Sequence, residues 1–205
     1  MAESYVQISE GTGKKLWTET TVVGADTKHA EIVKLGEPYL ASYTVVTGAV
    51  SVATLDSHLL QIMAGASLKV YVRQIRVYQF TVATTAALHY VDILRLTTAG
   101  TGGTTQNEQP LDSTDVASGA QAMTLPSSKG TEGAELDRQV SYILQTIPAS
   151  PAITSSLLYD FNWESNRQKS LIIPADTSKG IVVKNRVAIA GASVVIVAEY
   201  VEANF

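Results

Sequence analysis

The stretch SLKVYVRQIRVYQF, residues 67 to 80, decides the fold class of this chain. Its β-branched and aromatic residues alternate with polar ones, which is the periodicity of a half-buried β-strand. The apolar residues occupy even positions up to Val72 and odd positions from Ile75 onward. A β-bulge, or a bend from one sheet to another, near Arg73 and Gln74 accounts for this change of face.

Eight further runs have the same composition and are bounded by turn residues. They are ASYTVV (41–46), SVATL (51–55), ALHYVDILRL (87–96), RQVSYILQTI (138–147), SSLLYDFNW (155–163), SLIIP (170–174), GIVVKN (180–185) and a last run over 187–201. Nine such runs predict an all-β sandwich or barrel. Only GAELDRQ (133–139) and part of DVASGAQAM (115–123) are expected to form a helical turn or two.

Two of these runs carry more detail. In SSLLYDFNW, alternation places Tyr159, Phe161 and Trp163 in a row on one face, which predicts a strand that forms a wall of the core. The last run has two apolar segments on either side of Gly191, which predicts a hairpin or a kinked long strand.

The chain divides by composition into an arm and a sandwich. Residues 1–40 mix polar and small residues without sustained alternation and predict an extended N-terminal arm with one or two short strands. Residues 41–205 hold the strand-like runs and predict the sandwich domain. Within it, 97–133 is rich in Gly, Thr, Ser, Asp and Pro and predicts a long loop, a feature that is often functional or ordered by a partner.

Composition narrows the classes of partner. The 205 residues include 15 basic and 19 acidic side chains, with a pI near 5.4, so no general attraction to nucleic acid or an anionic membrane is expected. The chain has no cysteine, which excludes disulfides, thiol redox chemistry and cysteine-ligated zinc. Neither a signal peptide nor a membrane helix is predicted, so we expect synthesis in the cytoplasm without secretion.

Two glycine-rich segments have part of the pattern of a phosphate-binding loop. A Walker-type loop needs a Gly-Lys-Ser/Thr triplet four residues after its first glycine. Around Gly100 no lysine occurs before Lys129, and in GTGKK the pair Gly13 and Lys14 is followed by Lys15 rather than a hydroxyl residue. Nucleotide binding is therefore not predicted at either segment.

The remaining candidates for chemistry are isolated side chains. His29, His58 and His89 are too scattered to predict a metal site, and we interpret His89, near Asp92, as a partly exposed strand residue. Asp160 and Glu164 flank the aromatic row, as carboxylates do in glycosidases, but no second carboxylate can be placed opposite them. We therefore predict no catalytic residue, no cofactor and no metal; aromatics stacking on sugar rings without catalysis stay an alternative.

Basic residues lie on two runs that we expect to be neighbouring strands. They are Lys69, Arg73, Arg76 and Arg95. A basic strip there would suit an acidic partner surface, whereas the simpler interpretation is that the arginines cap a sheet edge or pair with nearby Asp and Glu.

The segment ILRLTTAGTGGTTQNEQPLDSTDVASGAQA (93–122) follows a strand with QIRVYQF and precedes a tryptophan and LIIPADTSKGIVVK. Over about residues 67 to 203 this combination resembles small β-sandwich virion proteins of tailed bacteriophages. The resemblance implies a jelly-roll-like antiparallel sandwich, non-enzymatic, assembled into the phage particle, with an arm that runs over neighbouring subunits. A Ser-rich insertion at 127–133 departs from the pattern.

From that resemblance we expect a virion structural protein, most consistent with a capsid decoration or accessory head protein anchored by its N-terminal arm. The expected partners are the major capsid protein or other virion proteins and further copies of this chain, as a trimer or as lattice-bound copies. A tail, neck or fibre protein is the alternative; there, loop 97–133 and the row Tyr159, Phe161 and Trp163 would bind a host receptor or glycan.

Overall fold

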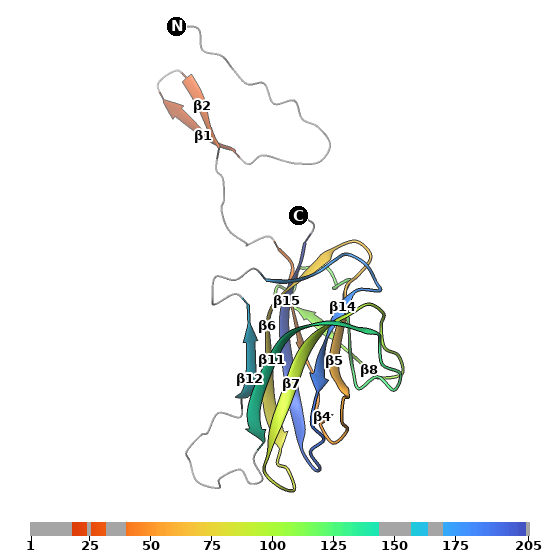
Figure 1. Cartoon of the computed structure of the whole chain (residues 1–205). Coiled ribbons are helices and arrows are strands. Elements are labelled where there is room, and N and C mark those ends of the chain that lie inside the picture. The colour runs from red at the N-terminus through yellow and green to blue at the C-terminus, as the bar shows by residue number, and fades with distance from the viewer. Residues whose placement is uncertain (1–17, 24–25, 32–39, 144–156, 164–169, 204–205) are drawn as a thin grey trace, which may run out of the picture. The chain divides into compact units, whose positions relative to one another are not determined.

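A computed structural model describes residues 18–23, 26–31, 40–143, 157–163 and 170–203 (Figure 1). The described residues form strands and turns and contain no helix, hence none that could cross a lipid bilayer. The chain forms two compact units, Met1–Tyr39 and Leu40–Phe205. In the first, β1 (Thr18–Val23) and β2 (Asp26–Glu31) pair as an antiparallel hairpin.

The second unit contains two antiparallel sheets packed together, which confirms the predicted all-β sandwich. The six-stranded sheet has the order β11–β7–β14–β5–β10–β8; its strands are β5 (His58–Met63), β7 (Ala87–Leu96), β8 (Thr104–Gln106), β10 (Gln121–Thr124), β11 (Glu132–Ile143) and β14 (Gly180–Asn185). The seven-stranded sheet has the order β12–β6–β15–β3–β9, with β13 beside β6 and β4 beside β15. Its strands are β3 (Ser42–Val46), β4 (Val50–Ser51), β6 (Lys69–Thr81), β9 (Glu108–Pro110), β12 (Leu157–Asn162), β13 (Leu171–Ile173) and β15 (Ser193–Ala203).

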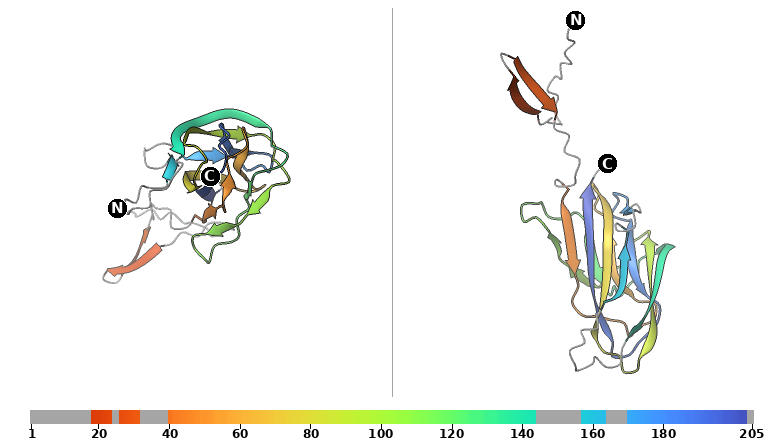
Figure 2. Two further views of the ribbon diagram at one scale, coloured as in Figure 1. Left: turned by 90° about the horizontal axis from the view of Figure 1, so that it is seen from below. Right: turned by 90° about the vertical axis from the view of Figure 1, so that its left-hand side faces the viewer.

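The change of face in β6 is a β-bulge. Strands β6 and β15 run side by side (Figure 2). Tyr200 of β15 lies opposite Val72, and Glu199 lies opposite Gln74, so Arg73 is the extra residue. Because the bulge adds one residue, the even-numbered apolar residues before it and the odd-numbered ones after it point to the same face and enter the same core. The first of the two explanations predicted from the sequence is therefore the correct one.

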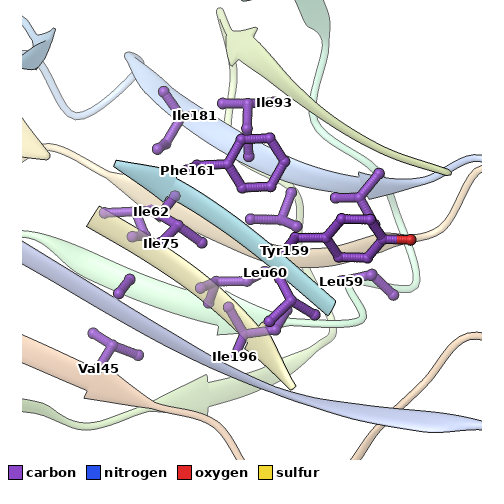
Figure 3. Close-up of a cluster of buried hydrophobic side chains, with 14 of the residues drawn as sticks. Val45, Leu59, Leu60, Ile62, Ile75, Ile93, Tyr159, Phe161, Ile181 and Ile196 are labelled. Carbon is purple, nitrogen blue, oxygen red and sulfur yellow. The ribbon is translucent and has the colours of Figure 1, made fainter. Parts of the chain in front are cut away.

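Side chains from both sheets meet in one hydrophobic core. Figure 3 shows Ile62, Ile93 and Ile181 of the six-stranded sheet near Ile75 and Phe161 of the seven-stranded sheet. Burying a side chain of this size stabilises the fold by about 1.5–3 kcal/mol. This core lies entirely within residues 40–203.

Strand β5 is not among the strands predicted from the sequence. All six of its residues, HLLQIM, are buried, because one face enters the core and the other is covered by the segment around Gly100. A strand covered on both faces lacks the alternation on which the prediction depended.

The segment 97–133 differs from the predicted loop. It contains β8, β9, β10 and the start of β11, and β8 and β9 form the edges of the two sheets on one side of the sandwich. The helical turns expected at 133–139 and 115–123 are wrong, since these residues lie in β11 and in a turn leading to β10.

The last run is neither a hairpin nor one kinked strand. Residues 187–192 form the connection from β14 in one sheet to β15 in the other. Gly191 has a φ of +79°, a left-handed conformation that glycine adopts without steric cost. The sequence signal therefore marked a turn correctly but not the change of sheet.

Candidate functional site

The most extensive polar constellation on the described residues is a series of linked ion pairs that ends in a hydrogen bond between His58 and Glu132; we call it the outer ion-pair chain. Its members, in order of contact, are His58, Glu132, Lys184, Asp56, Arg186, Asp92, Arg138 and Glu135. Asp92 of β7 lies opposite Lys184 of β14 and Arg138 of β11. Since Val91 and Ile93 enter the core, these side chains lie on the outer face of the six-stranded sheet.

Asp92 is the most buried carboxylate of the outer ion-pair chain. Both of its oxygens accept hydrogen bonds from Arg138, from Nε at 2.6 Å and from Nη2 at 2.8 Å, and Arg186 Nε lies 3.1 Å from Oδ2. This arrangement raises the pKa of Arg138. Guanidinium groups from two segments thus engage both oxygens of Asp92, so this carboxylate joins β7 to β11 and to the residues that follow β14.

The other end of the outer ion-pair chain joins His58 and Lys184 to Glu132. Glu132 accepts from Lys184 Nζ at 2.7 Å and lies 2.9 Å from His58 Nε2. Burial acts to raise the pKa of Glu132, but these hydrogen bonds outweigh it and hold that pKa below its usual value. Burial lowers the pKa of His58, whose Nδ1 is buried without a partner among the described residues. His58 is therefore a neutral imidazole that donates from Nε2.

His89 is fully buried, which corrects the prediction of a partly exposed strand residue. Asn185 donates from Nδ2 to the carbonyls of Val52 and Thr54, so its Oδ1 accepts from His89 Nε2 at 2.7 Å. The Tyr159 hydroxyl lies 2.7 Å from His89 Nδ1. Burial lowers the pKa of His89, so these contacts hold a neutral imidazole inside the core and tie β7, β12 and β14 together.

A third polar group fixes the turn that precedes β10. Glu202 of β15 is 5% exposed and accepts from Ser118 Oγ at 2.9 Å, Gly119 N at 3.0 Å and Ala120 N at 2.7 Å. Ser118 Oγ also lies 2.8 Å from the Tyr200 hydroxyl. These bonds hold part of the segment 97–133 onto the sandwich of its own chain.

Gly100 packs against the sandwich. Its N–H donates to Gln61 Oε1 at 3.0 Å, and its carbonyl accepts from Gln61 Nε2 at 3.2 Å. A Cβ at this position would lie 2.8 Å from the Ser128 carbonyl oxygen, so glycine permits the close approach. Gly13 and Lys14 lie outside the described residues.

The aromatic row is interior, as expected of a strand that walls the core. Tyr159 and Phe161 are each 1% exposed, and Trp163 is half-buried against the core. The ring centroids are 6.4 Å apart for Tyr159 and Phe161 and 6.2 Å apart for Phe161 and Trp163. Two of the three rings are inaccessible, so the idea that this row stacks on sugar rings or contacts a receptor is wrong.

The carboxylates beside the row are not brought together as an acid pair. Asp160 is exposed; its Oδ1 accepts from Gln74 Nε2 at 2.7 Å, and its main-chain groups bond to the amide of Gln139. Glu164 lies outside the described residues. The structure therefore supplies no second carboxylate for Asp160 within its described part.

The expectation that these basic residues lie on neighbouring strands is wrong, whereas the simpler interpretation of the arginines holds for two of them. Lys69, Arg73 and Arg76 lie on β6 of the seven-stranded sheet, whereas Arg95 lies on β7 of the other sheet. Arg76 pairs with Glu199, and Arg95 donates to the carbonyl of Ile172. These two arginines therefore have the structural role that the simpler interpretation gave them.

The two histidines of the second unit, His58 and His89, do not share a site. His29 lies in β2 of the first unit, and His58 and His89 lie in separate networks. Within residues 40–143, 157–163 and 170–203, no cluster of His, Asp and Glu side chains is arranged to hold a metal ion. The sequence did not reveal the outer ion-pair chain because its members come from four separate segments, 56–58, 92, 132–138 and 184–186. The local signal was Lys184, which alternates with the apolar Val183.

Comparison with protein-family models, with curated proteins and with solved structures finds no match to this chain.

Proposed function

We propose that the sandwich is a jelly roll and that the protein is a non-enzymatic structural protein of a tailed-bacteriophage virion. Within the virion we favour a decoration or accessory head protein that residues 1–40 anchor to the shell. The observation that carries the proposal is the order in which the long strands pair.

The eight strands that matter, in chain order, are β3, β5, β6, β7, β11, β12, β14 and β15. The first pairs with the last, the second with the seventh, the third with the sixth and the fourth with the fifth, always antiparallel. This nested order is that of a long hairpin rolled into two sheets, as in the jelly rolls of viral capsids and lectins.

Because jelly rolls serve many functions, the virion role needs further support. One support is the resemblance of residues 93–122 to phage sandwich proteins. A second is the separate unit Met1–Tyr39, whose described part is one two-stranded hairpin. A lone hairpin is marginally stable in water, so this unit gains order from a surface beyond the hairpin itself, as an anchoring arm would.

The polar groups of the sandwich also support a structural role. The outer ion-pair chain, the His89 network and Glu202 each connect separate strands or a turn. The donors and acceptors of these groups bond to one another and to the main chain, so they stabilise the fold.

The test compares the full chain with a variant lacking residues 1–39, each added to phage particles from which the protein has been removed. We expect the full chain to rebind to the particle and the truncated chain, which keeps the whole core, to lose occupancy. If the truncated chain binds with unchanged occupancy, the anchoring role of residues 1–40 is refuted, but the virion role is not. Absence of the protein from purified wild-type particles by mass spectrometry would refute the virion role, and electron microscopy of labelled particles separates a head from a neck, tail or fibre location.

A further inference from the structure

The edge of the six-stranded sheet at β11 has the features of a contact surface. Among the described residues β11 is the end strand of its sheet, with β7 on one side only. Val140 is 51% exposed and Tyr142 is 60% exposed, and they lie opposite Tyr90 and Leu88 of β7. Apolar side chains therefore gather on the outer face next to a free strand edge, which is a combination that soluble proteins usually avoid.

Only one half of this edge is regular. Register shifts interrupt the pairing with β7 between Glu132 and Glu135 and between Glu135 and Asp137. From Asp137 to Ile143 the pairing continues without a shift. Bulges and acidic residues protect the first half from pairing with another strand, whereas the second half carries neither bulge nor proline.

The main-chain groups that point away from β7 can be identified. The N–H of Arg138 donates to the neighbouring Asp137 Oδ1 at 2.7 Å, so it does not take part in the ladder with β7. Because these groups alternate along a strand, the N–H and C=O of Val140 and Tyr142 also point outward. On the inner face of β11, β12 covers this position, because the side-chain amide of Gln139 bonds to the main chain of Asp160 in β12.

We propose that β11 pairs with β11 of a second copy of this chain, antiparallel and about a twofold axis through Val140. The axis follows from the regular stretch, because Val140 is the midpoint of Asp137–Ile143. Val140 then lies opposite the partner's Val140 and exchanges both main-chain hydrogen bonds with it, while Arg138 lies opposite the partner's Tyr142.

This register places complementary side chains together. Arg138, Val140 and Tyr142 share the outer face, so the two valines meet at the axis and each guanidinium lies beside a tyrosine ring, a favourable cation–π geometry. Leu88 and Tyr90 of each copy extend the apolar row across both sheets. A twofold axis through Arg138 would instead oppose two like charges. The side chains along the edge of β11 are therefore complementary to those of a second copy of the same edge.

The absence of cysteine in the chain permits a register-specific test. Residues opposite each other in a hydrogen-bonded antiparallel pair have Cα atoms about 5.5 Å apart, within the range for a disulfide. Val140→Cys should give a disulfide-linked dimer under mild oxidation. Val46→Cys, which is similarly exposed at 58% but lies on the other sheet, is the matched control and should stay largely monomeric.

A second variant pair tests the hydrogen bonds. Val140→Pro removes an outward N–H without removing a bond to β7, so it should raise the dissociation constant of the dimer by about tenfold or more with little change in melting temperature. Val140→Thr keeps the N–H and the β-branch and should keep the dimer. Light scattering on the full chain measures the mass, and circular dichroism checks the fold.

A monomer or trimer by light scattering, or equal cross-linking of Val140→Cys and Val46→Cys, would overturn the proposal. It does not depend on the proposed virion role, because a dimer can form whether or not the protein is found in particles.

Discussion

Replacing Glu202 by Gln tests whether the sandwich itself orders the turn around Gly119. In the native protein one oxygen of Glu202 accepts from Ser118 Oγ and Ala120 N, and the other accepts from Gly119 N. An amide keeps one acceptor oxygen and replaces the other by an NH₂ group. In either orientation of Gln, at least one main-chain N–H therefore faces a donor.

The cost follows from the bonds that are lost. A hydrogen bond to a charged group contributes about 1.5–3 kcal/mol, and Glu202 is nearly inaccessible to water that could replace it. We expect a loss of about 2 kcal/mol, which corresponds to an increase of about thirtyfold in the opening equilibrium of the turn.

Hydrogen exchange at Gly119 and Ala120 measures local opening, and urea denaturation measures global stability. Glu199→Gln is the matched control, because Glu199 lies on the same strand but is 34% exposed and pairs with Arg76 at the surface. Its expected cost is below about 1 kcal/mol. If Glu202→Gln exchanges and unfolds like the native protein, the turn is not held by Glu202, and the role inferred for this carboxylate fails.

Two further predictions concern buried side chains. Burial lowers the pKa of His58 and His89 below the value of about 6.5 that histidine has in the unfolded chain, so the unfolded chain binds protons first as the pH falls. Stability should therefore be constant above about pH 7 and decrease below about pH 6.5, by at most about 1.4 kcal/mol per histidine and pH unit. Urea midpoints that do not change between pH 7.5 and 5.5 would contradict the neutral assignment. Phe161→Ala should destabilise the protein by about 3–5 kcal/mol in thermal unfolding, whereas Phe80→Ala, at an exposed ring, should cost less than about 0.5 kcal/mol; similar costs would show that the aromatic row does not support the core.

Strands with clear alternation and clear boundaries could be predicted closely from the sequence. The bounds expected for 87–96 and 180–185 are those of β7 and β14, and the bulge near Arg73 was visible as a change of parity. The prediction failed where both faces of a strand are covered, as in β5. It also failed at 133–139, where local helix propensity competes with the pairing of β11 to β7.

Sites built from distant residues were beyond prediction. Glu202 and Ser118 meet only because β15 runs beneath the turn before β10, and Asp92 and Arg186 meet only where β7 and β14 pair. The aromatic row shows the same limit: alternation established that Tyr159 and Phe161 share a face, but not whether that face contacts water or the core.

The sequence by itself determined the fold class, since a period of two residues over many short apolar runs can bury a core only as packed sheets. It also determined, by the lack of cysteine, that packing and polar contacts stabilise the fold. The tertiary structure decided which strands pair, which apolar faces are interior and which charges meet. These features depend on contacts between residues far apart in the chain, and such contacts produce no periodic pattern in the local sequence.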